Sequence, residues 1–253
     1  MNSIERRQEI LKRLQTNGMV SIQSLADELQ VSSMTIRRDL NRFADQGLVR
    51  MESGGALLNS STLYEHNMTI KSGIMFDEKV RIAQKCLDFI KEGDSIFLDA
   101  GTTTNELARL LSVRKNLVVM TNSLLAANSM IGMRDSKIIM CPGEFRELSM
   151  AYLGPLTASF VSQFTIDTLF LALDGIDLEK GLSVPDFLDG TTKQSLMEHA
   201  RKVICVADSS KFNHAFLYRI APLSNIDCII TDNGLDEQTL ERFSAKNVTI
   251  ITV

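Results

Sequence analysis

The sequence predicts an α/β protein, in which a small N-terminal domain of short helices precedes a larger domain with a mostly parallel sheet. Before residue 57, apolar residues recur at helical spacing in three short stretches. After residue 77, short apolar runs typical of buried strands alternate with amphipathic helical patterns. Residues 57–76 break this periodicity. We therefore predict domains at 1–56 and 77–253, joined by a linker at 57–76 with a short helix near 63–70.

The composition is that of a globular protein with a well-buried core. The 253 residues are 44% hydrophobic and 23% charged, with a net charge of −4. No apolar run approaches the roughly 18 residues of a membrane span, and the charged N-terminus predicts no signal peptide. We expect a cytoplasmic protein without membrane, metal or cofactor. Four widely spaced cysteines lack metal-ligand spacing and are expected to be reduced core thiols: Cys86, Cys141, Cys205 and Cys228.

The first two helices are expected at residues 4–16 and from Ser21 onward. The first buries Ile10, Leu11 and Leu14 and turns Glu5, Arg6, Lys12 and Arg13 outward, and Gly18 ends it. The second carries Leu25, Ala26 and Leu29 and is followed by a short turn at 30–32. Two short helices, a tight turn and a third helix are the order of a helix-turn-helix.

The third helix, which begins after Ser32 or Ser33, is basic on its outer face. Ser33 is a good N-cap, and Gly47 is suited to end the helix. The apolar face carries Ile36, Leu40 and Phe43, and the other faces carry Thr35, Arg37, Arg38, Asn41 and Arg42. Such side chains donate hydrogen bonds to phosphates and base edges, so the helix fits the major groove of DNA. The alternative is that the arginines only solvate an exposed face.

A β wing is predicted after this helix. Residues 48–50 form a short strand and residues 53–55 a tight turn, and Arg50 lies where it could reach DNA. The full set of expected DNA contacts is Ser33, Thr35, Arg37, Arg38, Arg42 and Arg50. Residues 1–56 carry a net charge of only +1, against −5 for the remainder. DNA affinity must then depend on geometry and on paired copies, so we expect a homodimer or homotetramer.

The N-terminal motifs resemble those of a known family. T-I-R-R-D-L at 35–40, G-L at 47–48 and G-G-A at 54–56 resemble the winged helix-turn-helix head of DeoR-family transcription regulators. Ser53 stands where that family usually has His. The resemblance covers residues 4–56 and implies that this domain binds operator DNA.

The larger domain alternates strands and helices from residue 77. Strands are expected at 95–98, 117–120, 137–140, 168–173, 203–207, 228–231 and 248–252. Helices are expected at 80–90, 106–111, between the strands at 117–120 and 137–140, and at 155–162, 190–199 and 236–243.

Polar clusters follow four of these strands, where ligands bind in open parallel sheets. They are Asp99–Asn105, Thr121–Ser123, Asp174–Gly175 and Asp208–Phe212. The first opens a helix and favours an anion, but it is not a Walker A loop. Each cluster alone is equally explained as a capped turn, whereas four at strand ends indicate a site.

Lys193 is expected in the first turn of a helix that starts near Asp189 or Gly190. The helix dipole disfavours a cation there, which is easier to understand if an anion binds nearby. The alternative is a solvated lysine on a flexible stem.

The same clusters resemble the DeoR-family sensor domain, over roughly residues 77–253. D-A-G-T-T-T at 99–104, T-N-S at 121–123, D-G-I-D at 174–177, Lys193 and D-S-S-K-F at 208–212 carry the resemblance. Asp189-Gly190 replaces the family's usual Glu-Ala. Family sensors resemble sugar-phosphate isomerases in fold and respond to phosphorylated sugars. The resemblance therefore implies an effector pocket lined by Asp99, Gly101, Thr102, Thr103, Asn122, Gly175, Lys193 and Lys211.

Three functions remain open from the sequence. The first is a sequence-specific repressor of a carbohydrate-utilisation operon, controlled by a phosphorylated sugar and not an enzyme. The second is a sugar-phosphate isomerase, with Asp99, Asp174 or Asp189 as general base and Lys193 stabilising charge. That reading gives the N-terminal domain no role. The third is an interaction module whose N-terminal domain binds protein instead of DNA.

Overall fold

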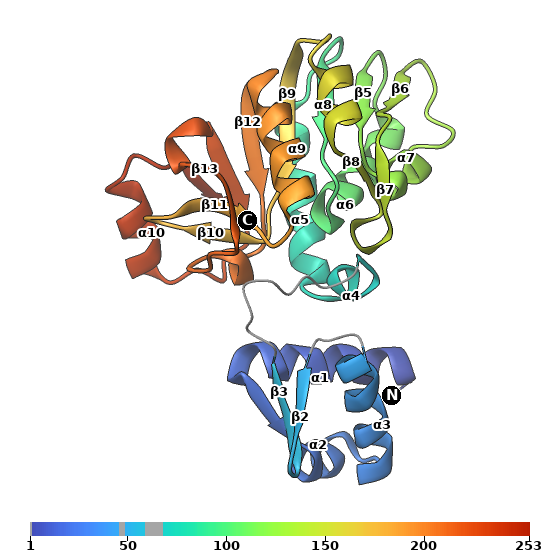
Figure 1. Cartoon of the computed structure of the whole chain (residues 1–253), viewed down its shortest axis with the longest axis vertical. Helices are drawn as coiled ribbons and strands as arrows, with labels where there is room; N and C mark the ends of the chain where they lie inside the picture. Colours follow the sequence, from blue (N-terminus) through green and yellow to red (C-terminus); the bar gives the residue numbers. More distant parts are fainter. Residues whose placement is uncertain (1, 46–48, 59–67) are drawn as a thin grey trace. The chain divides into compact units, whose positions relative to one another are not determined.

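A computed structural model describes residues 2–45, 49–58 and 68–253 of the chain. Contacts divide the chain into two compact units, Met1–Ile74 and Met75–Val253, which we call the N-terminal unit and the C-terminal unit. The helices and strands of each unit are labelled in Figure 1. Within the described residues, no helix combines the length and the apolar composition that a bilayer crossing requires.

The N-terminal unit is a three-helix structure with a small antiparallel sheet. Its elements are α1 (Ser3–Asn17), β1 (Met19–Ser21), α2 (Ile22–Leu29), α3 (Ser33–Asp45), β2 (Val49–Glu52) and β3 (Gly55–Leu58), followed by the short helix α4 (Met68–Gly73). The sheet order is β1-β3-β2. The expected apolar residues form the core, since Ile10, Leu14, Leu25, Ile36 and Leu40 are at most 2% exposed. The predicted helix-turn-helix order and wing are confirmed, and β1 is an addition that the sequence analysis did not include.

The wing is a tight hairpin whose turn is Ser53-Gly54. Glu52 pairs with Gly55, and Gly54 has φ +85°, a left-handed conformation that suits glycine. A Cβ on Gly55 would lie 2.1 Å from the Val20 carbonyl oxygen, so β3 needs glycine to approach β1. β3 continues to Leu58, two residues past the expected domain boundary. The predicted role of Gly47 and most of the predicted 63–70 helix lie outside the described residues.

The C-terminal unit is built on a seven-stranded parallel sheet. Its strands are β4 (Ser95–Leu98), β5 (Val118–Thr121), β6 (Lys137–Met140), β9 (Ile166–Ala172), β12 (Ala200–Val206), β14 (Cys228–Thr231) and β15 (Ile250–Thr252). Their order is β15-β14-β12-β9-β4-β5-β6, and every ladder among them is parallel. The predicted α/β class is therefore confirmed. The chain runs outward from β4 to β6 and then from β9 to β15, so the strand order reverses between β4 and β9.

Helices cover both faces of this sheet (Figure 1). The helices α5 (Phe76–Cys86), α6 (Thr102–Leu110) and α7 (Leu124–Ser129) pack on the face that carries Ile96 and Leu98. The helices α8 (Pro155–Val161), α9 (Phe187–Glu198) and α10 (Glu237–Ser244) pack on the face that carries Phe97. Alternate residues of β4 thus enter opposite cores, as a strand buried on both sides requires. All four cysteines are buried and free, as expected.

In the C-terminal unit, five short strands were not predicted. The hairpin of β7 (Glu144–Arg146) and β8 (Ala151–Leu153) follows β6, and β10 (Gly175–Asp177), β11 (Gly181–Val184) and β13 (Tyr218–Ala221) form a separate antiparallel sheet. Each has three or four residues, too few for an alternating pattern to stand out. The bounds of α9 also differ from the expected 190–199. Asp186 caps the helix by accepting from the Asp189 N–H, so α9 begins at Phe187.

Candidate functional site

The outer face of α3 is exposed as expected. Ile36, Leu40 and Phe43 are at most 3% exposed, whereas Ser33, Arg37, Arg38, Asn41 and Arg42 are exposed and Thr35 is half-buried. The N-cap differs by one residue from the prediction. The Thr35 N–H donates to Ser32 Oγ at 3.2 Å, while Ser33 Oγ donates to Gln23 on α2 at 3.3 Å.

An acidic residue in the signature has a structural role that the sequence analysis missed. Asp39 is 7% exposed, and its Oδ2 accepts from Arg6 Nε at 2.7 Å, which ties α1 to α3. The expectation that Arg6 faces solvent is therefore wrong. A signal was present, because Asp39 lies three residues after Ile36 and four before Phe43, on the border of the apolar face.

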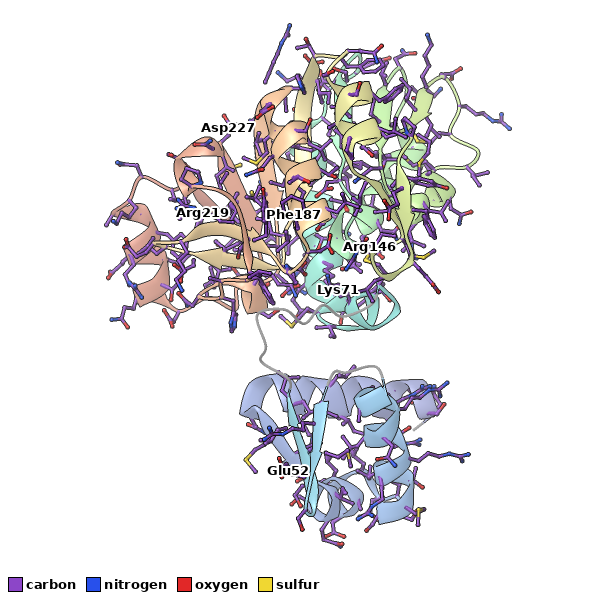
Figure 2. The ribbon with its side chains drawn as sticks, viewed as in Figure 1. Glu52, Lys71, Arg146, Phe187, Arg219 and Asp227 are labelled. Atoms are coloured by element: carbon purple, nitrogen blue, oxygen red, sulfur yellow. The ribbon has the colours of Figure 1, made fainter. Side chains whose placement is uncertain are left out.

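The arginines of α3 carry uncompensated charge. Among the described residues, no carboxylate pairs with Arg37, Arg38 or Arg42. On the wing, Arg50 does have a partner, since its Nη2 lies 2.9 Å from Glu52 Oε1. Glu52 is labelled in Figure 2. Both side chains of that pair are well exposed, so it is weak and an arriving phosphate can replace Glu52. The face of α3 can thus offer several guanidinium groups to an anionic partner.

In the C-terminal unit, Asp99 lies where the strand order reverses. It follows Leu98, which pairs with Thr121 on β5 and Phe170 on β9. Asp99 is 0% exposed, and its Oδ2 accepts from the Ala172 N–H at 3.1 Å and from Lys193 Nζ at 2.5 Å. Ligands of open parallel sheets bind at such a point, beyond the carboxyl ends of the strands.

Lys193 is buried among carboxylates. Its Nζ lies 2.5 Å from Asp99 and 3.3 Å from Asp189, one helical turn earlier on α9. Burial lowers the pKa of the ammonium, but Asp189 and Asp99, with a contribution from Asp174, outweigh burial and raise its pKa above the ordinary value. Because α9 begins at Phe187, Lys193 lies in the second turn and not the first. Asp99 and Asp189 together compensate the buried charge of Lys193.

Asn122 is a buried residue whose side chain makes no hydrogen bond in the described structure. It is 0% exposed, and its backbone carbonyl accepts from the Tyr152 N–H at 2.8 Å. Neither amide atom of its side chain has a hydrogen-bond partner, and neither has Asp99 Oδ1 on the adjacent strand end. A buried polar group without a partner costs about 1–3 kcal/mol, so native proteins retain one for a reason. The unused donors and acceptors of Asn122 and Asp99 thus lie at neighbouring strand ends, the region where ligands of open parallel sheets bind.

The N-terminus of α6 lies directly after Asp99. Gly101 is its N-cap residue, and no side chain caps the helix. Thr104 Oγ donates to the Asp99 carbonyl at 2.6 Å and fixes the turn. A Cβ on Gly101 would lie 2.3 Å from Ala172 Cβ, so glycine lets α6 pack against β9. The first-turn N–H groups, at Thr102 and Thr103, form the positive end of a helix of nine residues.

Two candidates from the sequence, Gly175 and Lys211, have other contacts in the structure. Gly175 opens β10, and a Cβ there would lie 2.7 Å from the His214 carbonyl oxygen, which gives the glycine a packing role. Lys211 follows β12, where its charge acts on Asp208. In the described part of the chain, no hydrogen bond or ion pair joins either residue to Asp99, Asn122 or Lys193.

A second buried ion pair lies at the end of β12. Lys79 of α5 is 3% exposed and its Nζ lies 4.0 Å from Asp208 Oδ2, in a side chain that is 1% exposed. Burial raises the pKa of Asp208, but Lys211, Lys79 and hydrogen bonds from Ser210 outweigh burial and lower it. Nothing in the sequence distinguished Lys79 from a solvated lysine.

We expect Asp208→Asn to lower stability at neutral pH and to flatten its loss in acid. Because the pKa of Asp208 is lowered by folding, its contribution is present above the unfolded pKa of about 3.9 and is lost as the pH falls through the folded value. Urea unfolding of both proteins between pH 7 and pH 3 measures this. The control is Glu198→Gln, at an exposed residue, whose unfolding free energy should change with pH as it does in the parent. The same pH dependence in Asp208→Asn would contradict the lowered pKa of Asp208.

Two family models match the chain, one in each unit. A DeoR-like helix-turn-helix domain matches residues 6–62, and a DeoR C-terminal sensor domain matches residues 75–233. The chain belongs to the DeoR family of transcriptional regulators. The C-terminal unit is therefore called the sensor unit below.

Relatives within the DeoR family extend along nearly the whole chain. The glycerol-3-phosphate regulon repressor of Escherichia coli K12 is 35% identical over 234 residues, 92% of this chain and 92% of its own. The transcriptional regulator GlpR of Haloferax volcanii is 33% identical, covering 98% and 96%. Ribose 5-phosphate isomerase A of Methanocaldococcus jannaschii matches 55% of each chain, with a TM-score of 0.41 and 16% identity. The Escherichia coli and Haloferax volcanii relatives are transcriptional regulators, so the chain is a DNA-binding regulator and the isomerase reading is not supported.

One departure from the DeoR-family pattern has a physical explanation. A Cβ on Gly190 would lie 2.0 Å from Cδ1 of Tyr218, whose ring packs against Phe187 at 5.2 Å between centroids. Tyr218 also donates from its hydroxyl to Gln194 Oε1 at 3.0 Å. The alanine that the family usually has at this position would clash with a tyrosine held on both sides. Gly190 and Tyr218 are therefore a matched pair in this chain.

Proposed function

We propose that this chain is a repressor of a carbohydrate-utilisation operon, and that a phosphorylated sugar bound to the sensor unit controls it. The observation that carries the proposal is Asn122, a fully buried amide with no hydrogen-bond partner. Asn122 and Asp99 Oδ1 suit the hydroxyl groups of a sugar. The uncapped N-terminus of α6 suits a phosphate. A related repressor is named for a glycerol-3-phosphate regulon, which agrees with this ligand class.

The candidate residues follow from this arrangement. The proposed DNA contacts are Ser33, Thr35, Arg37, Arg38, Arg42 and Arg50. The proposed effector residues that lie around one strand-end region are Asp99, Gly101, Thr102, Thr103, Asn122 and Lys193. Gly175 and Lys211, at neighbouring strand ends, are proposed to shape the surrounding loops.

Control requires that the effector bind one arrangement of the DNA-binding units better than another. Half-sites about 34 Å apart are read by paired units, so we propose a cytoplasmic homodimer or homotetramer. Sedimentation equilibrium of the full chain tests the oligomer, and a monomer at micromolar concentration that still binds DNA specifically would contradict it.

Asn122→Leu is the variant that tests the effector site. Replacing an unpartnered buried amide by an apolar side chain of similar size should leave stability unchanged or raise it. The same change removes hydrogen bonds to the effector, so the response to ligand should be lost. The measurement is a thermal-shift screen of phosphorylated sugars on both proteins; saturation at 100 times the Kd adds about 2.7 kcal/mol to the parent.

The matched control is Asn128→Leu, an exposed asparagine on α7, which should retain the full response. A screened sugar phosphate should also change the operator affinity of the parent and leave that of Asn122→Leu unchanged. The proposal fails if Asn122→Leu responds like the parent, or if no phosphorylated sugar alters either stability or operator affinity.

A further inference from the structure

A cationic cavity lies between α1 and α3 in the N-terminal unit. Its volume is about 800 Å³. The charged residues that line it are Arg6, Arg7, Arg37, Arg38, Asp39 and Arg42. Two of these arginines belong to α1, an element that the DNA-binding assignments above do not include.

The cavity has far more positive charge than its surroundings balance. Asp39 is compensated by Arg6 at 2.7 Å. Arg7 donates from Nε to the Ser3 carbonyl at 2.9 Å, and within the described residues no carboxylate pairs with it or with Arg37, Arg38 or Arg42. Four guanidinium charges thus meet around one hollow.

Arg13, nearly two turns further along α1, differs from the cavity arginines because it is paired with carboxylates. Its Nε lies 2.9 Å from Glu9, and it also pairs with Glu28 of α2. Carboxylates of the N-terminal unit thus pair with arginines outside the cavity. Among the residues that line the cavity, the one carboxylate is Asp39, which already pairs with Arg6. Like charges at close range repel, so the arrangement fits a surface that an external anion covers.

We propose that Arg7 is a DNA contact, and that α1 holds the phosphate backbone of one strand beside the groove occupied by α3. The inference rests on the proposed role of α3 as the recognition helix. A helix in the major groove, about 12 Å wide, has a phosphate backbone along each side. That backbone passes through the cavity, where Arg7 of α1 joins Arg42 of α3 in holding phosphates. Arg37 and Arg38 also line the cavity, and they are the two assigned to the base edges.

Phosphate contacts and base contacts predict different behaviour. A phosphate contact carries no sequence information, so losing it weakens binding to all duplexes equally. The loss of one phosphate contact also reduces the magnitude of the slope of log affinity against log salt concentration by about 0.9 for each DNA-bound unit. An acidic protein segment is the other anion that fits the cavity. If it is the true partner, replacing Arg7 changes neither the DNA affinity nor its salt slope.

The test uses the full chain with an operator selected by the parent protein from a random duplex library. Affinity for that operator and for a mixed-sequence duplex of equal length is measured by fluorescence anisotropy from about 50 to about 200 mM salt. Arg7→Ala should weaken both by the same factor and reduce the salt slope by about 0.9 per bound unit. Arg7→Lys should keep most of the slope, because it keeps the charge.

Arg13→Ala is the matched control on the same helix, and its salt slope should equal that of the parent. Circular dichroism of each variant verifies that the N-terminal unit is folded. An unchanged slope and affinity in Arg7→Ala, or a loss confined to the selected operator, would overturn the proposal. Failure of the underlying recognition-helix assignment is seen separately, as unchanged sequence discrimination in Thr35→Ala, Arg37→Ala and Arg38→Ala alike.

Discussion

Replacing Lys193 with methionine is expected to lower the unfolding free energy of the sensor unit by about 3–5 kcal/mol. The ammonium is 2% exposed and lies between Asp99 at 2.5 Å and Asp189 at 3.3 Å. Removing it leaves two carboxylates facing each other in the interior. A buried charge without a counter-ion costs far more than the ion pair contributes to stability, so the loss exceeds that of an ordinary surface lysine.

Urea unfolding of the full chain, followed by circular dichroism, measures this loss. Lys180→Met, at an exposed lysine, is the control and should change stability by less than about 0.5 kcal/mol. Adding Asp99→Asn and Asp189→Asn to Lys193→Met should recover most of the loss, because neutral amides replace the repelling carboxylates. A loss under about 1 kcal/mol in Lys193→Met alone would contradict the ionised arrangement.

This expectation changes how the effector site is best probed. Sequence reasoning makes Lys193 the natural residue to mutate for loss of effector response. The structure shows a lysine whose charge is already compensated, so its removal disturbs the fold and the site together. Asn122 separates the two effects, because its side chain makes no hydrogen bond in the described structure and its replacement removes only what a ligand would use.

The spacing of apolar residues along the chain predicted the helix-turn-helix and the parallel strands. The helix-turn-helix followed from the spacing of Ile36, Leu40 and Phe43 and from a serine cap. The cap is Ser32 and not Ser33, because two adjacent serines can each cap a helix and the sequence alone does not choose between them. The parallel strands followed from short apolar runs such as Ser95–Leu98, which are buried on both faces.

The features that were missed depend on residues far apart in sequence. Asp189 and Lys193 are four residues apart, and that spacing was visible, but Asp99 lies 94 positions before Lys193. The sheet β10-β11-β13 joins strands separated by more than 30 residues, and no strand in it is longer than four. Burial of Lys79 likewise depends on packing of α5 near Asp208. Only the three-dimensional structure supplies such pairings.

Arg38→Ala is expected to reduce affinity for the selected operator by about 1–3 kcal/mol per DNA-bound unit, which is about 5- to 150-fold. Arg38 is exposed on the face of α3, away from the apolar residues that hold the helix, so the variant should fold normally. A guanidinium that forms two hydrogen bonds with one guanine distinguishes it from the other bases. The loss should therefore fall on the operator and spare most of the affinity for mixed-sequence DNA.

Arg50→Ala is the variant with which Arg38→Ala is compared. Arg50 is proposed to hold a phosphate from the wing, so its removal should weaken operator and mixed-sequence DNA by the same factor. The ratio of the two affinities then falls in Arg38→Ala and stays constant in Arg50→Ala, whatever the absolute affinities are. If the ratio is unchanged in Arg38→Ala, this arginine is also a phosphate contact. The reading of bases must then lie with Arg37, Thr35 or another residue of α3.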